Sequence, residues 1–255
     1  MPRAASRSGA ASIAAIRERI IRCRRCPDLR RYCAAIATHK KREFAHDVYW
    51  GKPVPNLGAA DARLLIVGLA PAAHGGNRTG RMFTGDGSAD WLARSLFAHG
   101  FATQPTSVRR GDGYALIDAF MTAAIRCAPP GNKPTPRQMS NCASHLAAEL
   151  DALARIEVVV PLGKIGFDTI VRHLRARGFQ SRSGTLRFAH GAEFELRDVH
   201  NRRLTLLCSY HPSRQNTNTG KLSQAMLDQV FARARQLIGS PKTSLAPSAQ
   251  LSAAR

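Results

Sequence analysis

Residues 64–92 read LLIVGLAPAAHGGNRTGRMFTGDGSADWL, and this stretch decides the fold. It opens with residues 64–67, a short apolar run that is typical of a fully buried strand. Gly68 ends the run, a loop with five further glycines follows, and a helical pattern begins near Ser88. A strand, a glycine-rich loop and a helix in this order place a ligand at the carboxyl end of a sheet. We therefore expect the loop to form a wall of an active site.

The loop does not match the common nucleotide-binding loops. It contains no G-x-x-x-x-G-K-[ST], and no G-x-G-x-x-G directly follows the strand. A flexible or phosphate-cradling loop is the alternative interpretation. The polar side chains and the single aromatic of the loop argue against a simple connection; they are His74, Asn77, Arg78, Thr79, Arg81, Asp86 and Phe83.

Charge indicates the kind of partner. The chain has 255 residues, 44% of them hydrophobic, which is enough for a sizeable core. Its 38 Lys and Arg against 17 Asp and Glu give a formal net charge of +21, spread along the sequence. Such an excess repels itself unless a polyanion offsets it, so we expect nucleic acid, with an anionic membrane surface as the weaker alternative. We find no membrane-spanning run and no signal-peptide core, and expect a cytoplasmic protein.

Four of the six cysteines suggest a metal centre. Cys23 and Cys26 form a C-x-x-C at the end of a helical pattern, while Cys127 follows a strand and Cys142 lies on a helix. Together they supply four thiolates, the full complement for zinc or for an iron–sulfur cluster, and their spacing does not choose between the two. The alternative is that Cys127 and Cys142 are ordinary buried cysteines. We expect the other two cysteines in the core.

Further strands alternate with helices along the chain. We expect strands at residues 114–122, 157–161 and 204–208, a hairpin within 178–201, and helices between the strands. This order predicts one α/β domain over residues 11–238 with a mainly parallel sheet. We expect the tails, residues 1–10 and 239–255, to be disordered.

Three polar segments follow strand ends: the loop after Gly68, residues 126–132, and the loop that begins with His211. The carboxyl ends of parallel strands meet at one edge of a sheet, so these segments should converge on one crevice. His211 stands at a strand end and precedes a proline, which favours a site residue over a structural histidine.

Four motifs in this order resemble the family 5, or type b, uracil-DNA glycosylases of the iron–sulfur branch. They are GLAP at 68–71, HGGNRTGRMFTGD at 74–86, RCAPPGNKPTP at 126–136 and HPSRQNTNTGKL at 211–222. The resemblance covers about residues 20–238. It implies a three-layer α/β/α sandwich around a mainly parallel four-stranded sheet. It also implies a [4Fe-4S] cluster on Cys23, Cys26, Cys127 and Cys142 rather than zinc.

The resemblance also implies a reaction. A uracil, or another deaminated base such as hypoxanthine or xanthine, is flipped out of DNA and its N-glycosidic bond is hydrolysed, which leaves an abasic site. We expect a monofunctional, monomeric enzyme. The alternatives are a damaged-DNA-binding protein that has lost catalysis and a zinc-stabilised nucleic-acid binder.

Roles for individual residues follow from the same resemblance. His211 would donate a hydrogen bond to the uracil O2, Phe83 would stack on the base, and Asn77, with Asp86 as second choice, would act on the water. Gly68, Ala70 and Ala123 would line the base pocket. The residues expected to contact DNA are Arg78, Thr79, Arg81, Ser213, Arg214, Gln215, Asn216 and Lys221.

Two alanines depart from the wider superfamily. Ala70 stands where many members carry a polar residue that activates water, as is typical of the type b branch. Ala123 and Ala124 stand where type a relatives place a base-reading asparagine. The first substitution moves the polar catalyst further along the loop, and the second predicts a broader substrate range.

Overall fold

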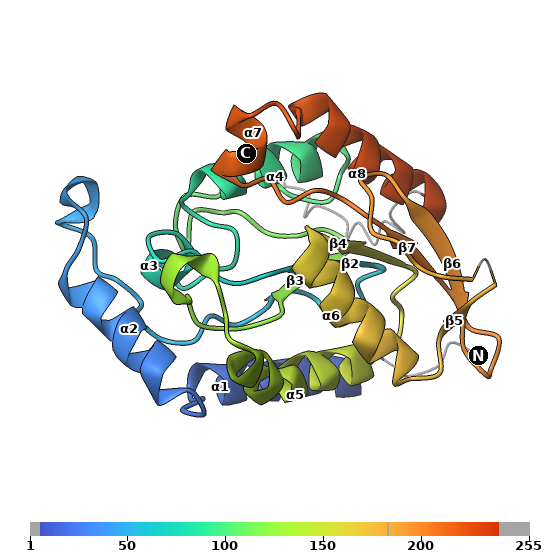
Figure 1. Ribbon diagram of the computed structural model, residues 1–255, viewed down its shortest axis with the longest axis horizontal. Helices are drawn as coiled ribbons and strands as arrows, with labels where there is room; N and C mark the ends of the chain where they lie inside the picture. The colour runs from blue at the N-terminus through green and yellow to red at the C-terminus, as the bar shows by residue number, and fades with distance from the viewer. Residues whose placement is uncertain (1–5, 183, 240–255) are drawn as a thin grey trace, which may run out of the picture.

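The computed structural model describes residues 6–182 and 184–239, with side chains from Ser12 onward. Within them, one mixed sheet has seven strands in the order β1-β3-β2-β4-β7-β6-β5. The strands are β1 Leu57–Gly58, β2 Leu64–Gly68, β3 Ala119–Ala123, β4 Val158–Pro161, β5 Gln180–Ser181, β6 Glu193–Arg197 and β7 Arg203–Leu207. Figure 1 shows this sheet running through the body between the helices.

The helices connect these strands. The longer ones are α1 Ser6–Ile21, α2 Pro27–Thr38, α4 Gly87–Ala98, α5 Pro136–Ala152, α6 Lys164–Arg175 and α8 Gln224–Ile238. The short ones are α3 Gly76–Thr79, α7 Arg214–Asn218, and the 3-10 turns η1 Arg42–Phe44 and η2 Pro130–Asn132. No helix of the described chain is both long enough and apolar enough to cross a membrane.

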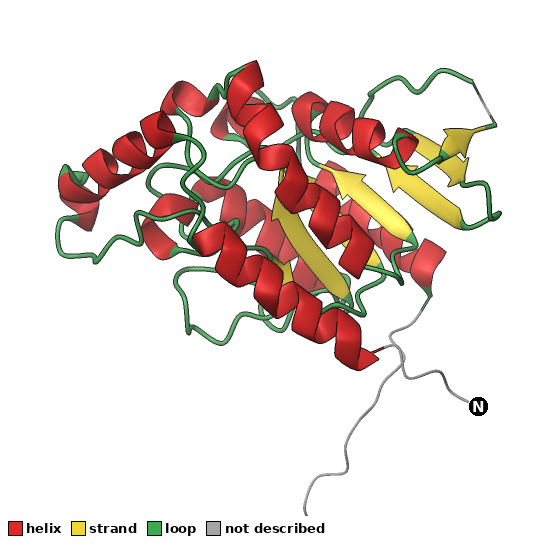
Figure 2. Cartoon of the chain, turned by 90° about the horizontal axis from the view of Figure 1, so that it is seen from below, coloured by secondary structure: helices red, strands yellow, loops and turns green. Residues whose placement is uncertain are grey.

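Strand β2 shows how the layers arise. All five of its residues are buried, and its side chains alternate between two cores. Leu64 and Ile66 pack with residues of α4 and α8, whereas Leu65 and Val67 pack with residues of α1, α5 and α6. Helices therefore cover both faces of the sheet, as Figures 1 and 2 show.

The expected four-stranded sheet was wrong in strand number. The four expected strands, β2, β3, β4 and β7, are mutually parallel and central. Three antiparallel strands, β1, β5 and β6, extend the sheet at its edges. Two of these are only two residues long, too short for any periodic signal, and β6 is mostly exposed or half-buried.

Other boundaries also differ from the predictions. Strand β3 starts only at Ala119, not at residue 114 as predicted. Helix α1 begins at Ser6, so residues 6–10, predicted to be disordered, are helical. Residues 1–5 and 240–255 lie outside the described residues.

Candidate active site and cysteine pocket

The carboxyl ends of the parallel strands meet at one edge of the sheet. Gly68 pairs with Ala123 in register, and Leu162 bridges to Ser209 beyond the ends of β4 and β7. The loops carrying residues 69–86, 124–132 and 210–222 therefore leave from this edge. The predicted convergence of three polar segments is what the register produces.

Phe83 and His211 lie together at this edge. Their ring centroids are 5.7 Å apart, with the planes inclined by 35°. Phe83 also packs on the backbone of β2, because a Cβ added to Gly68 would lie 2.7 Å from the Cε2 atom of Phe83. Gly163 lets His211 approach in the same way, since an added Cβ would stand 3.3 Å from that of His211. Phe83, Gly68 and His211 are thus brought together.

The surroundings of His211 set its charge. Part of the residue stays accessible, but protein atoms enclose the imidazole, and this burial lowers the pKa of His211 to about 4. The side chain is therefore neutral near pH 7 and keeps a single N–H to donate. Its backbone is held as well, because Asn216 donates its Nδ2 to the carbonyl of His211 at 2.8 Å.

Asn77 is fully buried in α3. Its Nδ2 donates to the carbonyl oxygens of Cys33 and Ala73, both at 3.3 Å. The Oδ1 atom has no hydrogen-bond partner among the described residues. The action on water that the sequence analysis expects of Asn77 stays a prediction, to which this unpaired acceptor is relevant.

Asp86 caps the helix that follows the active-site loop. It is the N-cap of α4, where we expected Ser88, and its Oδ1 accepts from the backbone N of Ala89 at 3.0 Å. Its carboxylate also presses on Gly75, where an added Cβ would lie 1.9 Å from Oδ2. Burial raises the pKa of Asp86. Asp86 thus fixes the loop to the helix that follows it.

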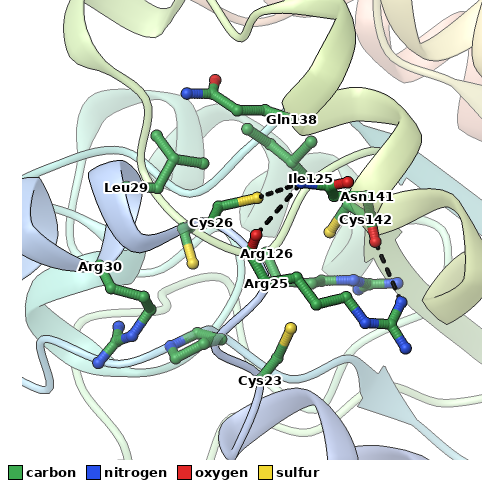
Figure 3. Close-up of a pocket in the computed structure, with 12 residues that line it drawn as sticks. Cys23, Arg25, Cys26, Leu29, Arg30, Ile125, Arg126, Gln138, Asn141 and Cys142 are labelled. Atoms are coloured by element: carbon green, nitrogen blue, oxygen red, sulfur yellow. Dashed lines mark hydrogen bonds between the residues drawn. The ribbon is translucent and has the colours of Figure 1, made fainter.

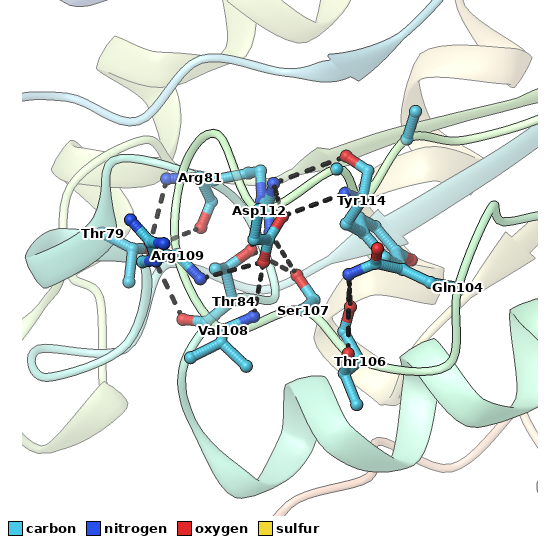
Figure 4. Close-up of polar contacts among 12 residues, drawn as sticks. Thr79, Arg81, Thr84, Gln104, Thr106, Ser107, Val108, Arg109, Asp112 and Tyr114 are labelled. Atoms are coloured by element: carbon cyan, nitrogen blue, oxygen red, sulfur yellow. Dashed lines mark hydrogen bonds and ion pairs between the residues drawn. The ribbon is translucent and has the colours of Figure 1, made fainter.

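Three residues expected to contact DNA are turned inward. Arg81 is buried and pairs with Asp112 through Nη1 and Nη2, at 2.8 and 2.7 Å (Figure 4). Hydrogen bonds from Arg81 and three backbone amides hold the pKa of Asp112 well below its usual range despite burial. Arg78 pairs with Asp47 at 2.6 Å, and the hydroxyl of Thr79 donates to the carbonyl of Gly75 at 3.1 Å. These side chains brace the loop, a role that no sequence signal distinguishes from phosphate contact.

The other expected DNA contacts lie on and beside α7. Ser213 caps this short helix, and Asn216 is turned toward His211. Arg214, Gln215 and Lys221 are exposed, so they remain available to a ligand at the crevice.

The four predicted metal ligands line one pocket (Figure 3). Cys23 follows α1, Cys26 is the residue before α2, Cys127 follows β3, and Cys142 lies in α5. Their side chains are not gathered tightly, since no three His, Cys, Asp or Glu of the described chain are close enough to hold a metal ion. Four cysteines that line one pocket nevertheless supply the type and number of donors that an iron–sulfur cluster or zinc needs.

The surroundings of two of these cysteines raise their pKa values. Burial raises the pKa of Cys142 to about 11, and a hydrogen bond with Cys33, together with burial, raises the pKa of Cys127. A nearby cation would therefore favour the thiolate forms of Cys127 and Cys142. The two cysteines predicted to lie in the core, Cys33 and Cys208, are both fully buried. Cys208 packs in the core beside the sheet.

Arg126 is a residue of this region that the sequence did not single out. It is 1% exposed, and its Nη2 lies 2.6 Å from Glu149 Oε2, which also accepts from Thr122 at 2.6 Å. The Nε and Nη1 atoms of Arg126, beside the cysteine pocket, have no partner among the described residues. The sequence signal that could have identified Arg126 as a residue of this region is its position directly before Cys127.

Comparison with known proteins identifies the family. The model of the Uracil DNA glycosylase superfamily matches residues 55–235. A type-5 uracil-DNA glycosylase of Mycobacterium tuberculosis is 44% identical over 232 residues, covering 91% of this chain and 84% of that protein. A type-5 enzyme of Thermus thermophilus is 42% identical over 217 residues, covering 85% and 94%.

A more distant relative is the type-4 uracil-DNA glycosylase of Archaeoglobus fulgidus, 25% identical over 161 residues that cover 63% of this chain and 70% of that protein. The type-5 proteins align with far more of the chain at higher identity. The family model and these alignments lead to one conclusion: the chain belongs to the uracil-DNA glycosylase superfamily and, within it, to the type-5 family.

Proposed function

We propose that this protein excises uracil from DNA by hydrolysing the N-glycosidic bond, and leaves an abasic site. The observation that carries the proposal is the contact of Phe83 with Gly68 and His211 at the carboxyl edge of the sheet. A flat ring, a close approach of the backbone and a neutral hydrogen-bond donor are what a pocket for an extruded pyrimidine requires.

The chemistry depends on negative charge that develops on the departing base. The neutral imidazole of His211 donates its N–H to the uracil O2, where that charge accumulates, and the Phe83 ring stacks on the base. A donor fixed in advance typically contributes 10²–10³-fold to the rate, on the order of 3–4 kcal/mol. No proton needs to leave His211 for this to work.

The attacking water is the task of Asn77. Its unpaired Oδ1 accepts a hydrogen bond from water but takes no proton. This suits a dissociative reaction in which the base leaves first and the water then adds to the oxocarbenium-like sugar. Asp86, whose Oδ1 caps α4, is the second candidate. Ala70, within the first motif, supplies no polar group.

Ala123 at the end of β3 has no side-chain group that could form a hydrogen bond with the edge of the base. We propose that other deaminated bases, such as hypoxanthine and xanthine, are therefore accepted as well. Inosine-containing duplex excised no faster than the uncatalysed background would contradict this part of the proposal.

We further propose that Cys23, Cys26, Cys127 and Cys142 hold a [4Fe-4S] cluster. When bound, the cluster would supply positive charge that favours the thiolate forms, and the four cysteines would tie α1 and α2 to α5 through it. A purified protein with iron and visible absorbance supports the cluster. A colourless protein with stoichiometric zinc refutes it.

The activity itself is tested on a duplex with one G·U mismatch. After incubation, alkali should cut the strand at the uracil position, and free uracil should be released. A protein that binds the duplex in a salt-sensitive way but leaves it resistant to alkali would be a damaged-DNA-binding protein that has lost catalysis.

A further inference from the structure

A basic segment beside the active-site loop has no role in the reaction. Residues 39–48, here called the basic arm, follow α2 and lead toward β1. Lys40, Lys41 and Arg42 are exposed and consecutive. Figures 1 and 2 both show α2 and the segment after it projecting from one end of the molecule, and α2 contacts α3 of the active-site loop.

The acidic residues of the arm leave its positive charge largely uncompensated. Glu43 lies 3.5 Å from Lys41, but the two side chains are 60% and 49% exposed, and such pairs contribute little in water. Asp47 is engaged with Arg78 at 2.6 Å. The side chains of Lys40, Lys41 and Arg42 thus present cations to solvent.

The arm is mounted on the active-site loop through Arg78. The Arg78 guanidinium stacks 3.8 Å from the centre of the Phe44 ring, pairs with Asp47, and donates to the carbonyl of Gly85 at 2.7 Å. A single side chain therefore holds both the arm and the loop that carries Phe83. A flexible, merely solvated charge run has no such mounting.

His74 makes a second link between the two segments. Its Nδ1 lies 2.9 Å from the hydroxyl of Tyr49, and its ring is stacked with Phe44 at 6.5 Å between centroids. The backbone continues the connection, because the N of Gly51 donates to the carbonyl of Asn77 at 3.0 Å. The position of the arm is thus fixed relative to the residue proposed to orient the water.

We propose that the basic arm is a second contact for duplex DNA, which binds phosphates of the strand beside the extruded nucleotide. The inference rests on the proposed function for its choice of ligand. Phosphate contacts by Lys and Arg give affinity without sequence preference and release counterions. Because the arm is fixed to the active-site loop, the same contact places the duplex over the Phe83–His211 pair.

The test is the salt dependence of binding to an undamaged duplex, which needs no excision. The variant Lys40→Ala/Lys41→Ala/Arg42→Ala is compared with Arg155→Ala/Arg172→Ala/Arg175→Ala. The latter residues are also exposed but lie toward the amino edge of the sheet, before β4 and late in α6. We expect the slope of log K against log salt to fall by about 3 for the arm variant and by less than about 1 for the control.

An equal slope for both variants would overturn the inference. The variant Lys40→Gln/Lys41→Gln/Arg42→Gln, which keeps side-chain length, must reproduce the alanine result, and circular dichroism must show that each variant is folded. If the wild-type protein binds the duplex but does not excise uracil, the proposed function fails while the slopes still decide whether the arm contacts DNA.

Discussion

His211 can act as a donor whose charge does not change across the physiological range. Burial lowers its pKa to about 4, below the value of about 6.5 for an exposed histidine. The neutral form is therefore present from pH 8 down to about 5, and it is lost only as the pH falls through the lowered pKa. We predict a single-turnover excision rate that His211 leaves unchanged over this interval. A step in the rate with a midpoint near pH 6.5 would contradict this assignment.

Gly68 leaves room for the Phe83 ring. A methyl group at this position would stand 2.7 Å from Cε2 and 2.8 Å from Cζ of Phe83, closer than carbon atoms pack. We predict that Gly68→Ala displaces the ring and lowers the single-turnover rate at least tenfold. Gly87→Ala serves as the control for the glycine change, since Gly87 is not in the left-handed region and an added Cβ would meet only the Nε atom of Arg214, at 3.8 Å. A rate for Gly68→Ala equal to that of the wild type would show that the ring position is unimportant.

At the same scale, the sequence predicted which residue types gather at the site but not which way they point. Phe83, Gly68 and His211 meet because each lies at or after the end of a parallel strand, and strand order is readable from apolar runs. Arg81 stands in the same motif, yet its partner Asp112 is 31 residues away in an irregular segment. Nothing local to Arg81 indicates that pairing.

The active-site loop and the basic arm act as one element joined by Arg78. Arg78→Ala removes the contacts to Asp47, Gly85 and the ring of Phe44 together. We predict a loss of about 2–3 kcal/mol of unfolding free energy, because the Arg78 side chain, which is 11% exposed, gives up its charge-assisted hydrogen bonds. Hydrogen exchange should also rise in residues 39–51.

Two further variants sharpen the Arg78 experiment. Arg78→Lys should recover only part of the stability, since an ammonium group cannot reproduce the fork of the guanidinium. Arg94→Ala, at an exposed position on α4, provides the control for loss of a surface cation. Unchanged exchange in the arm of Arg78→Ala would contradict the view that this side chain couples the two segments.

Among the elements, those with a physical signal in the sequence were predicted. Thr135 followed by Pro136 is typical of a helix start, and in the structure Thr135 is the N-cap of α5 and forms a capping box with Gln138. The central strands were marked by uninterrupted burial. Helix α7 was not predicted, because its five polar residues show no hydrophobic periodicity. The N-cap residue Ser213 is the one local signal of a helix start there.

At the scale of the whole molecule, the cysteine pocket joins segments that are distant in sequence. Cys23 and Cys26 lie near the N-terminal helices, while Cys127 and Cys142 belong to the body of the domain. We predict that Cys142→Ala loses iron and visible absorbance and has a lower Tm. Chelation of the wild-type protein should lower the Tm similarly.

Cys208→Ala is the matched control for the cluster. Cys208 is fully buried, but it packs in the core beside the sheet and does not line the cysteine pocket. It should retain iron at the wild-type level. Equal iron in both variants would remove Cys142 from the ligand set.

The overall architecture could be predicted from the sequence as far as buried runs extend. A central parallel sheet between helices follows from apolar strands separated by amphipathic segments. The hairpin predicted within residues 178–201 is present as β5 and β6. Its pairing with β7 and the two-residue strand β1 could not be predicted, because pairing partners rather than their own sequences add these residues to the sheet. Net charge predicted a polyanion but not which surface would meet it.

The measurement that tests the central claim most directly is the single-turnover excision of uracil by wild-type protein and by His211→Ala, with enzyme in excess over a G·U duplex. The account predicts rapid excision by the wild type and a rate lower by about 10²–10³ for the variant, with nearly unchanged affinity for the duplex. An equal excision rate, or a variant that loses only affinity, would contradict it, and would assign His211 to docking rather than to stabilisation of the departing base.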